Sequence, residues 1–169
     1  MTNDRFSQQY FCMHDLLESM KITHEEKAII APERVPLTCG QLCRQIEYAV
    51  AFFNHHGLGR NDRIAVVLPN GPEMAVTFLS VIAVAACAPL NPDYQKQEYD
   101  FYLSDINASA LIVQAGMDSP ARLVARSLNI PVIELKPLIE KEECSPWKMY
   151  SFRFASIITT DCRFKTGID

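Results

Sequence analysis

The chain has 169 residues, of which 49% are hydrophobic and 21% are charged, and its formal net charge is −4. This composition is too apolar for intrinsic disorder and is typical of one soluble globular domain with at most a short appendage. The weakly acidic balance argues against a surface that coats nucleic acid and against a polybasic membrane anchor.

The first clear element along the chain is a helix that begins after Thr38. The apolar run 28–31 precedes it and ends at Pro32. Thr38 can cap the first amides of a helix, and Gln41, three residues later, can complete a capping box. Gly57 suits the left-handed residue that ends a helix. The helix has an apolar stripe at helical spacing, made of Leu42, Ile46, Ala49, Val50 and Phe53.

The clearest strand covers residues 63–68. Its continuous apolar sequence is typical of a strand that is covered on both faces in a parallel sheet. The turn at Asn70–Glu73 combines residues that cap a helix, a proline for the first turn and an acidic side chain that favours the helix dipole. We expect a buried helix at 72–86 and a short strand at 87–90, which together complete a β-α-β unit.

One uncharged run, 74–92, is almost long enough to span a bilayer. However, Pro89, Asn91 and Pro92 interrupt it, and it is rich in alanine where a membrane helix is rich in leucine. A helix that is apolar on nearly every side also occurs in the buried layer of an α/β domain. We therefore predict no transmembrane span.

The alternation of helix and strand continues toward residue 135. Strands that are separated by segments of helix length imply right-handed crossovers and a mostly parallel sheet. The predicted fold class is therefore α/β, with a partial, mostly parallel sheet and flanking helices. The later elements are a helix at 95–105, a strand at 110–113, a helix at 120–128 and a strand at 131–135.

The six cysteines form neither a Cys-x-x-Cys pair nor a zinc-ligand spacing. Thiols scattered in apolar surroundings favour a reducing compartment, and we predict a cytoplasmic protein. Residues 1–9 are polar and lack the apolar stretch of a secretory signal. The cysteines are Cys12, Cys39, Cys43, Cys87, Cys144 and Cys162.

Two glycine-containing segments are candidates for ligand contact. Gly57-Leu58-Gly59 follows a helix and leads to a strand, whereas a phosphate-binding glycine loop follows a strand and opens a helix. We interpret it as a helix stop and a turn. The Asn70-Gly71 turn has the strand-to-helix order of a ligand crevice but only one glycine, and we interpret it as a helix cap.

The titratable and aromatic side chains do not predict an active site by their chemistry. The pair His55-His56 at a helix end favours a solvated pair that compensates the helix dipole. In the helix at 95–105, Asp100 and Asp105 indicate a wet face, and Tyr99 and Tyr102 indicate packing. The chain contains no Walker loop, nucleophile elbow or His-Glu-x-x-His motif.

Three further segments, in a fixed order, carry a more specific pattern. They are Leu37–Leu42 (LTCGQL), Asp62–Asn70 (DRIAVVLPN) and Ala88–Tyr94 (APLNPDY), and the last continues at Glu98–Asp105 (EYDFYLSD). Together they resemble the N-terminal part of the adenylate-forming, AMP-binding enzymes: acyl-CoA synthetases, 4-coumarate-CoA ligases, luciferases and peptide-synthetase adenylation domains. The FYLSD run is most similar to oxalate-CoA-ligase-like and related acyl-CoA synthetases. The resemblance covers residues 16–135.

The resemblance implies an AMP-dependent synthetase or ligase that activates a carboxylic acid. Members of the family use ATP and Mg²⁺ to form an acyl-adenylate and pyrophosphate, and many then transfer the acyl group to coenzyme A. The protein contributes positioning and charge stabilisation for the departing pyrophosphate. The implied partners of the full-length family are therefore a small carboxylic acid, ATP and coenzyme A, and no nucleic acid.

The functional motifs of the family lie downstream of the matched region. They are a glycine-rich phosphate loop, an aromatic-Thr-Glu motif, a ribose-binding aspartate and a C-terminal-domain lysine. The stretch 157–167 stands where the phosphate loop should approach, but it offers only Gly167, and Asp161 would repel an anion. We therefore assign no catalytic, cofactor-binding or metal-binding residue to this chain, and we expect it to be inactive alone.

The change of pattern near residue 143 predicts two parts. Residues 1–143 are expected to be a partial AMP-binding N-terminal domain, and residues 144–169 a divergent tail in which Phe152, Phe154 and the isoleucines at 157–158 could form one strand. A frameshift, an unspliced intron or an incomplete gene model would each give such a truncated product. A half-built sheet exposes an edge and an apolar face, which favours self-association. The alternative function is a non-catalytic, partner-binding module derived from such an enzyme.

Overall fold

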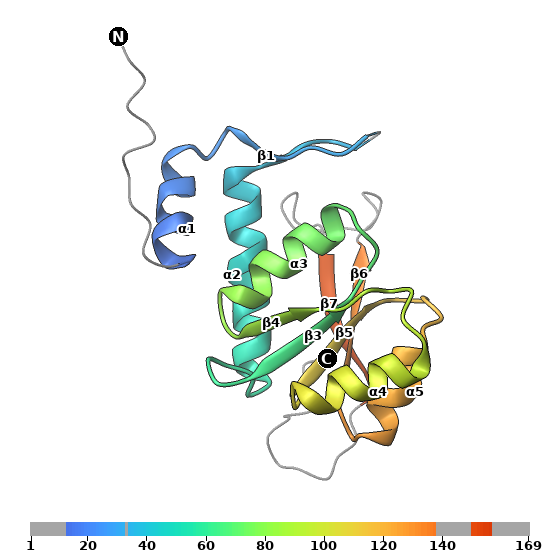
Figure 1. Ribbon diagram of the computed structural model, residues 1–169. Helices are drawn as coiled ribbons and strands as arrows, with labels where there is room; N and C mark the ends of the chain where they lie inside the picture. Colours follow the sequence, from blue (N-terminus) through green and yellow to red (C-terminus); the bar gives the residue numbers. More distant parts are fainter. Residues whose placement is uncertain (1–12, 33, 138–149, 157–169) are drawn as a thin grey trace.

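The computed structural model describes residues 13–32, 34–137 and 150–156 and shows an α/β arrangement of helices around a sheet (Figure 1). The helices are α1 (Met13–Ile22), α2 (Cys39–His55), α3 (Pro72–Ile82), α4 (Lys96–Asp105) and α5 (Pro120–Ser127). The strands are β1 (Lys27–Ile29), β2 (Leu37–Thr38), β3 (Arg63–Val67), β4 (Ala86–Pro89), β5 (Ala110–Gln114), β6 (Val132–Pro137) and β7 (Tyr150–Ser156).

The main sheet has five strands in the order β4-β3-β5-β6-β7. Its first four strands are parallel to one another, and β7 pairs with β6 in the antiparallel sense. The predicted α/β class with a mostly parallel sheet is therefore confirmed. β1 and β2 form a separate two-stranded antiparallel sheet, which projects as an arm beyond α2 and α3 (Figure 1).

The start of α2 has the predicted capping box. The backbone amide of Gln41 donates to the Thr38 hydroxyl at 3.3 Å, and the Gln41 side-chain oxygen accepts from the Thr38 amide at 3.0 Å. At the other end, Gly57 has the left-handed φ of 76° that a side chain would disfavour. The signals that begin and end this helix are local, and they operate as the sequence predicts.

β3 contributes to two hydrophobic cores because successive side chains of a strand point to opposite faces. Ile64 and Val66 belong to the core under α2 and α3, and Ala65 and Val67 belong to the core under α4 and α5. All four side chains are buried. The prediction of a strand covered on both faces is confirmed, and helices lie on both sides of the sheet (Figure 1).

α3 is shorter than the sequence pattern predicts. It ends at Ile82, four residues before the expected end, because Ala86 already pairs with Arg63 of β3. The turn between α3 and β4 contains no glycine or proline, so the sequence gives no signal for the end of the helix. The helix begins after Gly71, which is its N-cap, so Asn70 does not cap it.

Helix α1 and the two-stranded sheet of β1 and β2 are not among the features that the sequence pattern predicts. α1 packs against α2, and its Met13, Leu17 and Met20 lie against the first core. β1 and β2 pair through Lys27 and Thr38 across a connection that carries no tight-turn signature.

The predicted C-terminal strand is described in part. β7 contains Phe152 and Phe154 and pairs with β6, whereas residues 157–158 lie outside the described residues. The division of the chain at residue 143 stays a prediction. Among the described residues, no helix is long and apolar enough to cross a membrane.

A buried hydroxyl in α3 gives a prediction about stability. Thr77 is fully buried, and its hydroxyl makes no hydrogen bond to any described residue. Because an unsatisfied buried polar group is costly, we expect Thr77→Val to raise the free energy of unfolding by about 1 kcal/mol in a urea titration. Ser80→Ala is the control, since the Ser80 hydroxyl donates to the Val76 carbonyl at 2.7 Å, and it should lower stability. A lower stability of Thr77→Val would contradict the prediction.

The thiol of Cys87 in β4 gives a prediction about reactivity. Burial raises its pKa from 9.0 to about 11, so the thiol stays protonated well above neutral pH. At pH 8 this shift removes about 99% of the reactive thiolate. The thiolate that remains is more nucleophilic because its pKa is higher, which offsets part of the loss in reaction rate. We expect Cys87 to react with iodoacetamide about 10-fold more slowly in the folded chain than in the urea-unfolded chain, as measured by mass spectrometry of the modified peptide. Equal rates in the two states would contradict this.

Candidate functional site

The carboxyl ends of the parallel strands meet at one edge of the sheet. We call the loops after β3, β4 and β5 at this edge the carboxyl edge; they comprise residues 68–71, 90–95 and 115–119. The chain leaves β3 toward α3 on one face, and it leaves β4 and β5 toward α4 and α5 on the other face. Ligands of open α/β sheets bind where neighbouring strands connect to opposite faces. The carboxyl edge is therefore the candidate functional site of this fold.

The buried side chain of Tyr99 holds the loop after β4. Its hydroxyl donates to the Asn91 carbonyl at 2.9 Å. Burial raises the pKa of Tyr99. The phenol therefore stays neutral at physiological pH and can donate to the Asn91 carbonyl.

Arg122 of α5 holds the loop after β5. Its Nε donates to the Met117 carbonyl at 3.0 Å, and one terminal nitrogen donates to the Gln114 carbonyl at 2.9 Å. The other terminal nitrogen donates a hydrogen bond to the Glu134 carboxylate of β6 at 2.7 Å and forms an ion pair with it. All three nitrogens are thus used by the protein itself. Arg122 is a structural clamp, not a receptor for a phosphate or a carboxylate.

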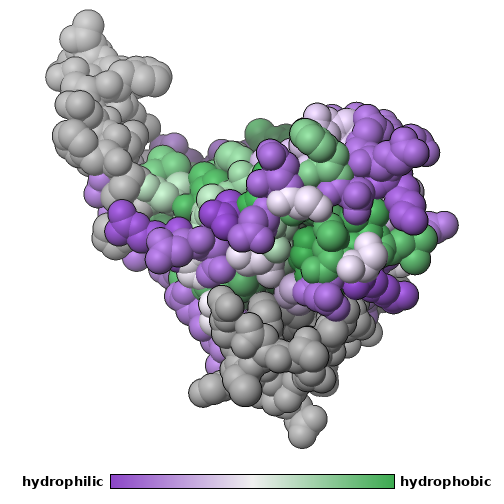
Figure 2. All heavy atoms as spheres, turned by 60° about the horizontal axis from the view of Figure 1, so that its bottom comes forward, coloured by the Kyte–Doolittle hydropathy of each residue, from purple (hydrophilic) through white to green (hydrophobic). Residues whose placement is uncertain are grey.

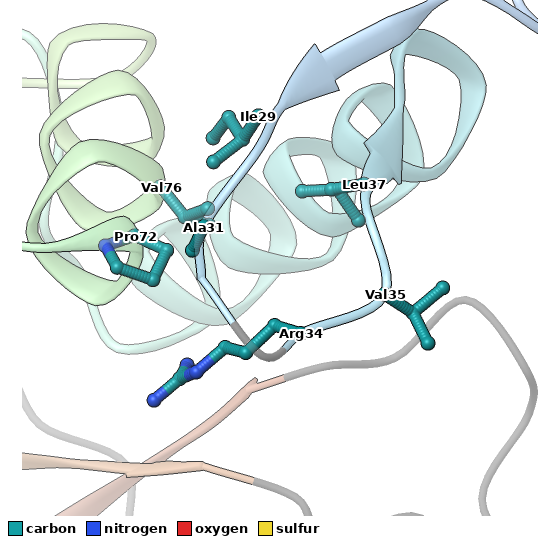
Figure 3. A pocket seen from close by; sticks show the side chains of 7 residues that line it. All are labelled: Ile29, Ala31, Arg34, Val35, Leu37, Pro72 and Val76. Atoms are coloured by element: carbon teal, nitrogen blue, oxygen red, sulfur yellow. The ribbon is translucent and has the colours of Figure 1, made fainter.

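A small hollow lies between the β1–β2 arm and the start of α3 (Figure 3). Its volume of about 10 Å³ has room for one water molecule. Arg34, at its rim, forms an ion pair with Glu73 of α3. The other side chains are apolar and offer no reactive group: Ile29, Ala31, Val35, Leu37, Pro72 and Val76. The ion pair and the apolar contacts around the hollow therefore hold the β1–β2 arm against α3, and the hollow contains no reactive group.

A larger open groove of about 470 Å³ lies along α1 and α2. Its floor is mostly apolar, and Lys21 at the rim pairs with Glu18 at 2.9 Å and Glu47 at 3.4 Å. Elsewhere, exposed apolar side chains occur on α4 and α5, at Phe101 and Leu123. Figure 2 shows apolar surface on the side of the molecule where these two helices lie. None of these surfaces brings together groups that could perform a reaction.

The other candidate residues agree with their predicted structural roles, except that His56 of the predicted solvated pair is half-buried. His55 is exposed, and the Nδ1 of His56 lies 2.7 Å from the Phe52 carbonyl of its own helix. Asp100 and Asp105 are exposed on α4, as expected of a wet face. Gly57 and Gly59 form the turn between α2 and β3.

Tyr99 and Tyr102 are packing residues, as predicted. Tyr99 is fully buried, and the ring of Tyr102 stacks on that of Tyr94 with centroids 5.2 Å apart and an interplanar angle of 14°. What the sequence interpretation missed is the hydrogen-bonding role of the Tyr99 hydroxyl and the clamp made by Arg122. Ser119 could have been found, because Ser-Pro is a typical N-cap followed by a first-turn proline.

No metal site is apparent in the part of the chain that the structure describes, since it contains no group of three His, Cys, Asp or Glu side chains placed to hold an ion. The stretch 157–167, compared above with the phosphate loop, lies outside the described residues. Cys12, Cys144 and Cys162 also lie outside them. The assignment of no catalytic or binding residue to this chain therefore stays a prediction.

The chain is similar in sequence to two CoA ligases. The chain is 36% identical over 107 residues to a probable CoA ligase, CCL9, of Humulus lupulus, covering 63% of this chain and 20% of that protein. It is 34% identical over 118 residues to the oxalate–CoA ligase of Arabidopsis thaliana, covering 68% of this chain and 23% of that protein. The chain thus spans about a fifth to a quarter of the length of these relatives.

Solved structures share the fold. Apo MatB from Rhodopseudomonas palustris superposes with a TM-score of 0.64 at 19% identity, covering 73% of this chain and 25% of that one. VinN superposes with a TM-score of 0.63 at 23% identity, covering 74% and 32%. A family profile described as "AMP-binding enzyme" matches residues 17–156, which is most of the chain. On this match the chain belongs to the AMP-binding, adenylate-forming enzyme family.

Proposed function

We propose that this chain forms the first portion of the N-terminal domain of a ligase that activates a carboxylic acid with ATP and transfers it to coenzyme A. The single observation that carries the proposal is the family match over residues 17–156, which spans every element from α2 to β7. The names of the relatives, a probable CoA ligase and an oxalate–CoA ligase, support the choice of reaction class.

We further propose that the isolated 169-residue chain does not catalyse this reaction. Gripping a nucleotide phosphate needs several consecutive backbone amides, which a glycine-rich loop supplies. The described loops of the carboxyl edge contain two glycines, Gly71 and Gly116, one in each of two separate loops. The guanidinium of Arg122, which binds the loop that contains Gly116, is already used by protein oxygens. These features support a structural contribution to a site that other residues would complete.

Carboxylate-dependent exchange between ATP and labelled pyrophosphate tests this proposal. We expect the isolated chain with Mg²⁺ to give no exchange above a buffer blank with oxalate, L-aspartate or a fatty acid. The Arabidopsis oxalate–CoA ligase, assayed with oxalate, is the positive control. Exchange above the blank with the purified chain, abolished by removal of Mg²⁺, would show that the chain holds a working site.

A chimera tests whether this segment can support the proposed reaction when the rest of a ligase is supplied. Residues 17–137 replace the corresponding segment of the Arabidopsis oxalate–CoA ligase, which keeps all of its downstream residues. We expect the chimera to recover oxalate-dependent exchange that is absent when the segment is deleted. A chimera that is folded by circular dichroism but inactive would count against the proposal.

The second candidate function is a non-catalytic module that binds a partner through a sheet edge. β4 is unsuited to this role. The amides of Ala86 and Leu90 donate to the carbonyls of Asp62 and Val66, so the amide positions of Cys87 and Pro89 face outward. Proline has no N–H to donate to an added strand. The described sequence of β7, at the other edge, has no proline. We therefore place this alternative at β7, where an added strand could pair.

Partner binding is tested with a full-length CoA ligase of the same family and the purified chain. We look for a complex by size-exclusion chromatography and by a pull-down. If a complex forms and the chimera is inactive, the partner-binding module is favoured over the role as part of a catalytic ligase domain. A monodisperse monomer that captures no such partner would exclude this alternative.

A further inference from the structure

The Asn70-Gly71 turn combines an asparagine with the residue type that hinders attack by the backbone least. Both residues are exposed, in the loop of the carboxyl edge that leads from β3 to α3. The backbone nitrogen that follows an asparagine can reach the carbonyl carbon of its side chain and close a succinimide ring. Glycine has no Cβ to obstruct this approach. The sequence pair therefore favours loss of the side-chain amide, and the fold decides whether the native chain allows it.

This reaction uses the backbone N–H of Gly71, and no described residue occupies that N–H. The Gly71 N–H and the Asn70 side chain make no hydrogen bond to any part of the chain that the structure describes. The carbonyl of Gly71, by contrast, accepts from the Ala75 amide at 3.1 Å. The helical ladder of α3 therefore begins after the attacking nitrogen, and the attack breaks none of the described hydrogen bonds.

The other described asparagines precede an amide that the fold already uses, or a residue without an N–H. Three of the following amides donate to backbone carbonyls: Asp62 to Gly59 at 2.9 Å, Ala108 to Leu103 at 3.1 Å and Ile130 to Ala125 at 2.8 Å. Asn54 precedes His55, whose amide belongs to the ladder of α2. Asn91 precedes Pro92, which has no N–H. Among the asparagines of the described residues, the fold thus leaves Asn70 the least protected.

We propose that Asn70 is a site of spontaneous deamidation in the folded chain. The Gly71 nitrogen forms a bond to Cγ of Asn70, the bond from Cγ to Nδ2 breaks, and the Gly71 amide proton departs with Nδ2 as ammonia. Solvent water then opens the succinimide. Cleavage between the ring nitrogen and Cγ gives aspartate, and cleavage between the ring nitrogen and the backbone carbonyl carbon gives isoaspartate. Nothing is oxidised or reduced, and water is the sole co-reactant.

Incubation of the purified full chain at pH 8, followed by peptide mass spectrometry, tests the proposal. An isoaspartyl methyltransferase with a labelled methyl donor identifies the rearranged product. We expect Asn70 to deamidate at least about 10-fold faster than every other described asparagine, at a rate within about 3-fold of its rate in urea. Folding should slow Asn61 and Asn107 at least about 10-fold, because their following amides must first be released.

Gly71→Ala tests the role of the attacking residue. A Cβ at this position would meet Glu73 Oε2 at 3.4 Å, an ordinary van der Waals contact, so the variant should fold. We expect it to slow deamidation of Asn70 about 10-fold or more, because the methyl group obstructs the attack. Gly59→Ala is the matched control, since a Cβ there meets nothing within 4 Å, and it should leave the rate unchanged.

Three outcomes would each overturn the proposal. They are a rate at Asn70 that folding lowers 10-fold or more, an equally fast reaction at a second described asparagine, and an unchanged rate in Gly71→Ala. The comparison of the folded and the urea-unfolded chain needs no variant, so it decides the proposal even if Gly71→Ala fails to fold by circular dichroism.

Deamidation also changes the charge of the carboxyl edge, because a neutral amide becomes a carboxylate. The effect on a ligand rests on the proposed function, which brings a phosphate-bearing nucleotide to this edge. In the chimera we expect Asn70→Asp to raise the KM for ATP about 3-fold at low salt, since like charges repel. Asn54→Asp, on α2, is the control and should leave the KM unchanged. An unchanged KM in Asn70→Asp would refute the effect on the ligand. An inactive unsubstituted chimera would refute the proposed function, and the deamidation rates of the isolated chain would still decide the modification.

Discussion

Phe53→Ala should lower the free energy of unfolding by about 3–5 kcal/mol. Phe53 lies on the inner face of α2 with none of its surface exposed, in the core that α2 and α3 form over the sheet. Truncation removes most of a large apolar side chain and leaves a cavity that its neighbours fill only in part. A loss of this size is a large fraction of the stability of an ordinary domain.

Urea denaturation followed by circular dichroism measures this effect. Phe101→Ala is the matched control. It is the same substitution on another helix, but Phe101 is 62% exposed, so the change should stay within about 0.5 kcal/mol. Similar losses for the two variants would mean that Phe53 is not a core residue of the chain in solution.

Arg122→Ala is expected to destabilise the chain by about 2 kcal/mol. The guanidinium of Arg122 is partly buried, and its removal leaves the carbonyls of Gln114 and Met117 and the carboxylate of Glu134 without their shared donor. Hydrogen bonds to a charged donor are stronger than neutral ones, but the partial exposure of this pair reduces the value of a buried ion pair. The loop after β5 and the start of β6 should loosen together.

The same urea titration tests this clamp against a nearby control. Arg126 lies one turn further along α5 and is exposed, so Arg126→Ala should cost about 0.5 kcal/mol or less. Arg122→Lys should recover little, because an ammonium cannot reproduce the planar fork that serves three acceptors. A full recovery by lysine would show that charge alone, and not the fork, stabilises the loop.

The sequence predicts those parts of the fold that have local causes. The Thr38 capping box and the left-handed Gly57 need only neighbours in the chain, and the strand at β3 follows from an unbroken apolar run. The end of α3 has no local cause: it is set by the pairing of Ala86 with Arg63, and the alanine-rich sequence around it suits a helix as well as a strand.

The candidate site is less predictable for the same reason. The spacing of Tyr99 indicates packing, which is correct, but the partner of its hydroxyl is the Asn91 carbonyl, which lies 8 residues earlier in the loop after β4. Arg122 occupies a position that is often solvated on a surface helix, and its acceptors lie on three different segments. Only the assembled sheet brings these groups together.

The pairing of β3 with β5 also bears on how the chain folds. Ile64 pairs with Ala110, which lies 46 positions later in the chain, and α3, β4 and α4 all lie between the two partners. Closing a loop of that length costs conformational entropy before the central strands gain their ladder. Because such non-local pairings slow folding, we expect this polypeptide to fold more slowly than a helical protein of equal size, with nascent chains exposed to chaperones until residue 114 has left the ribosome.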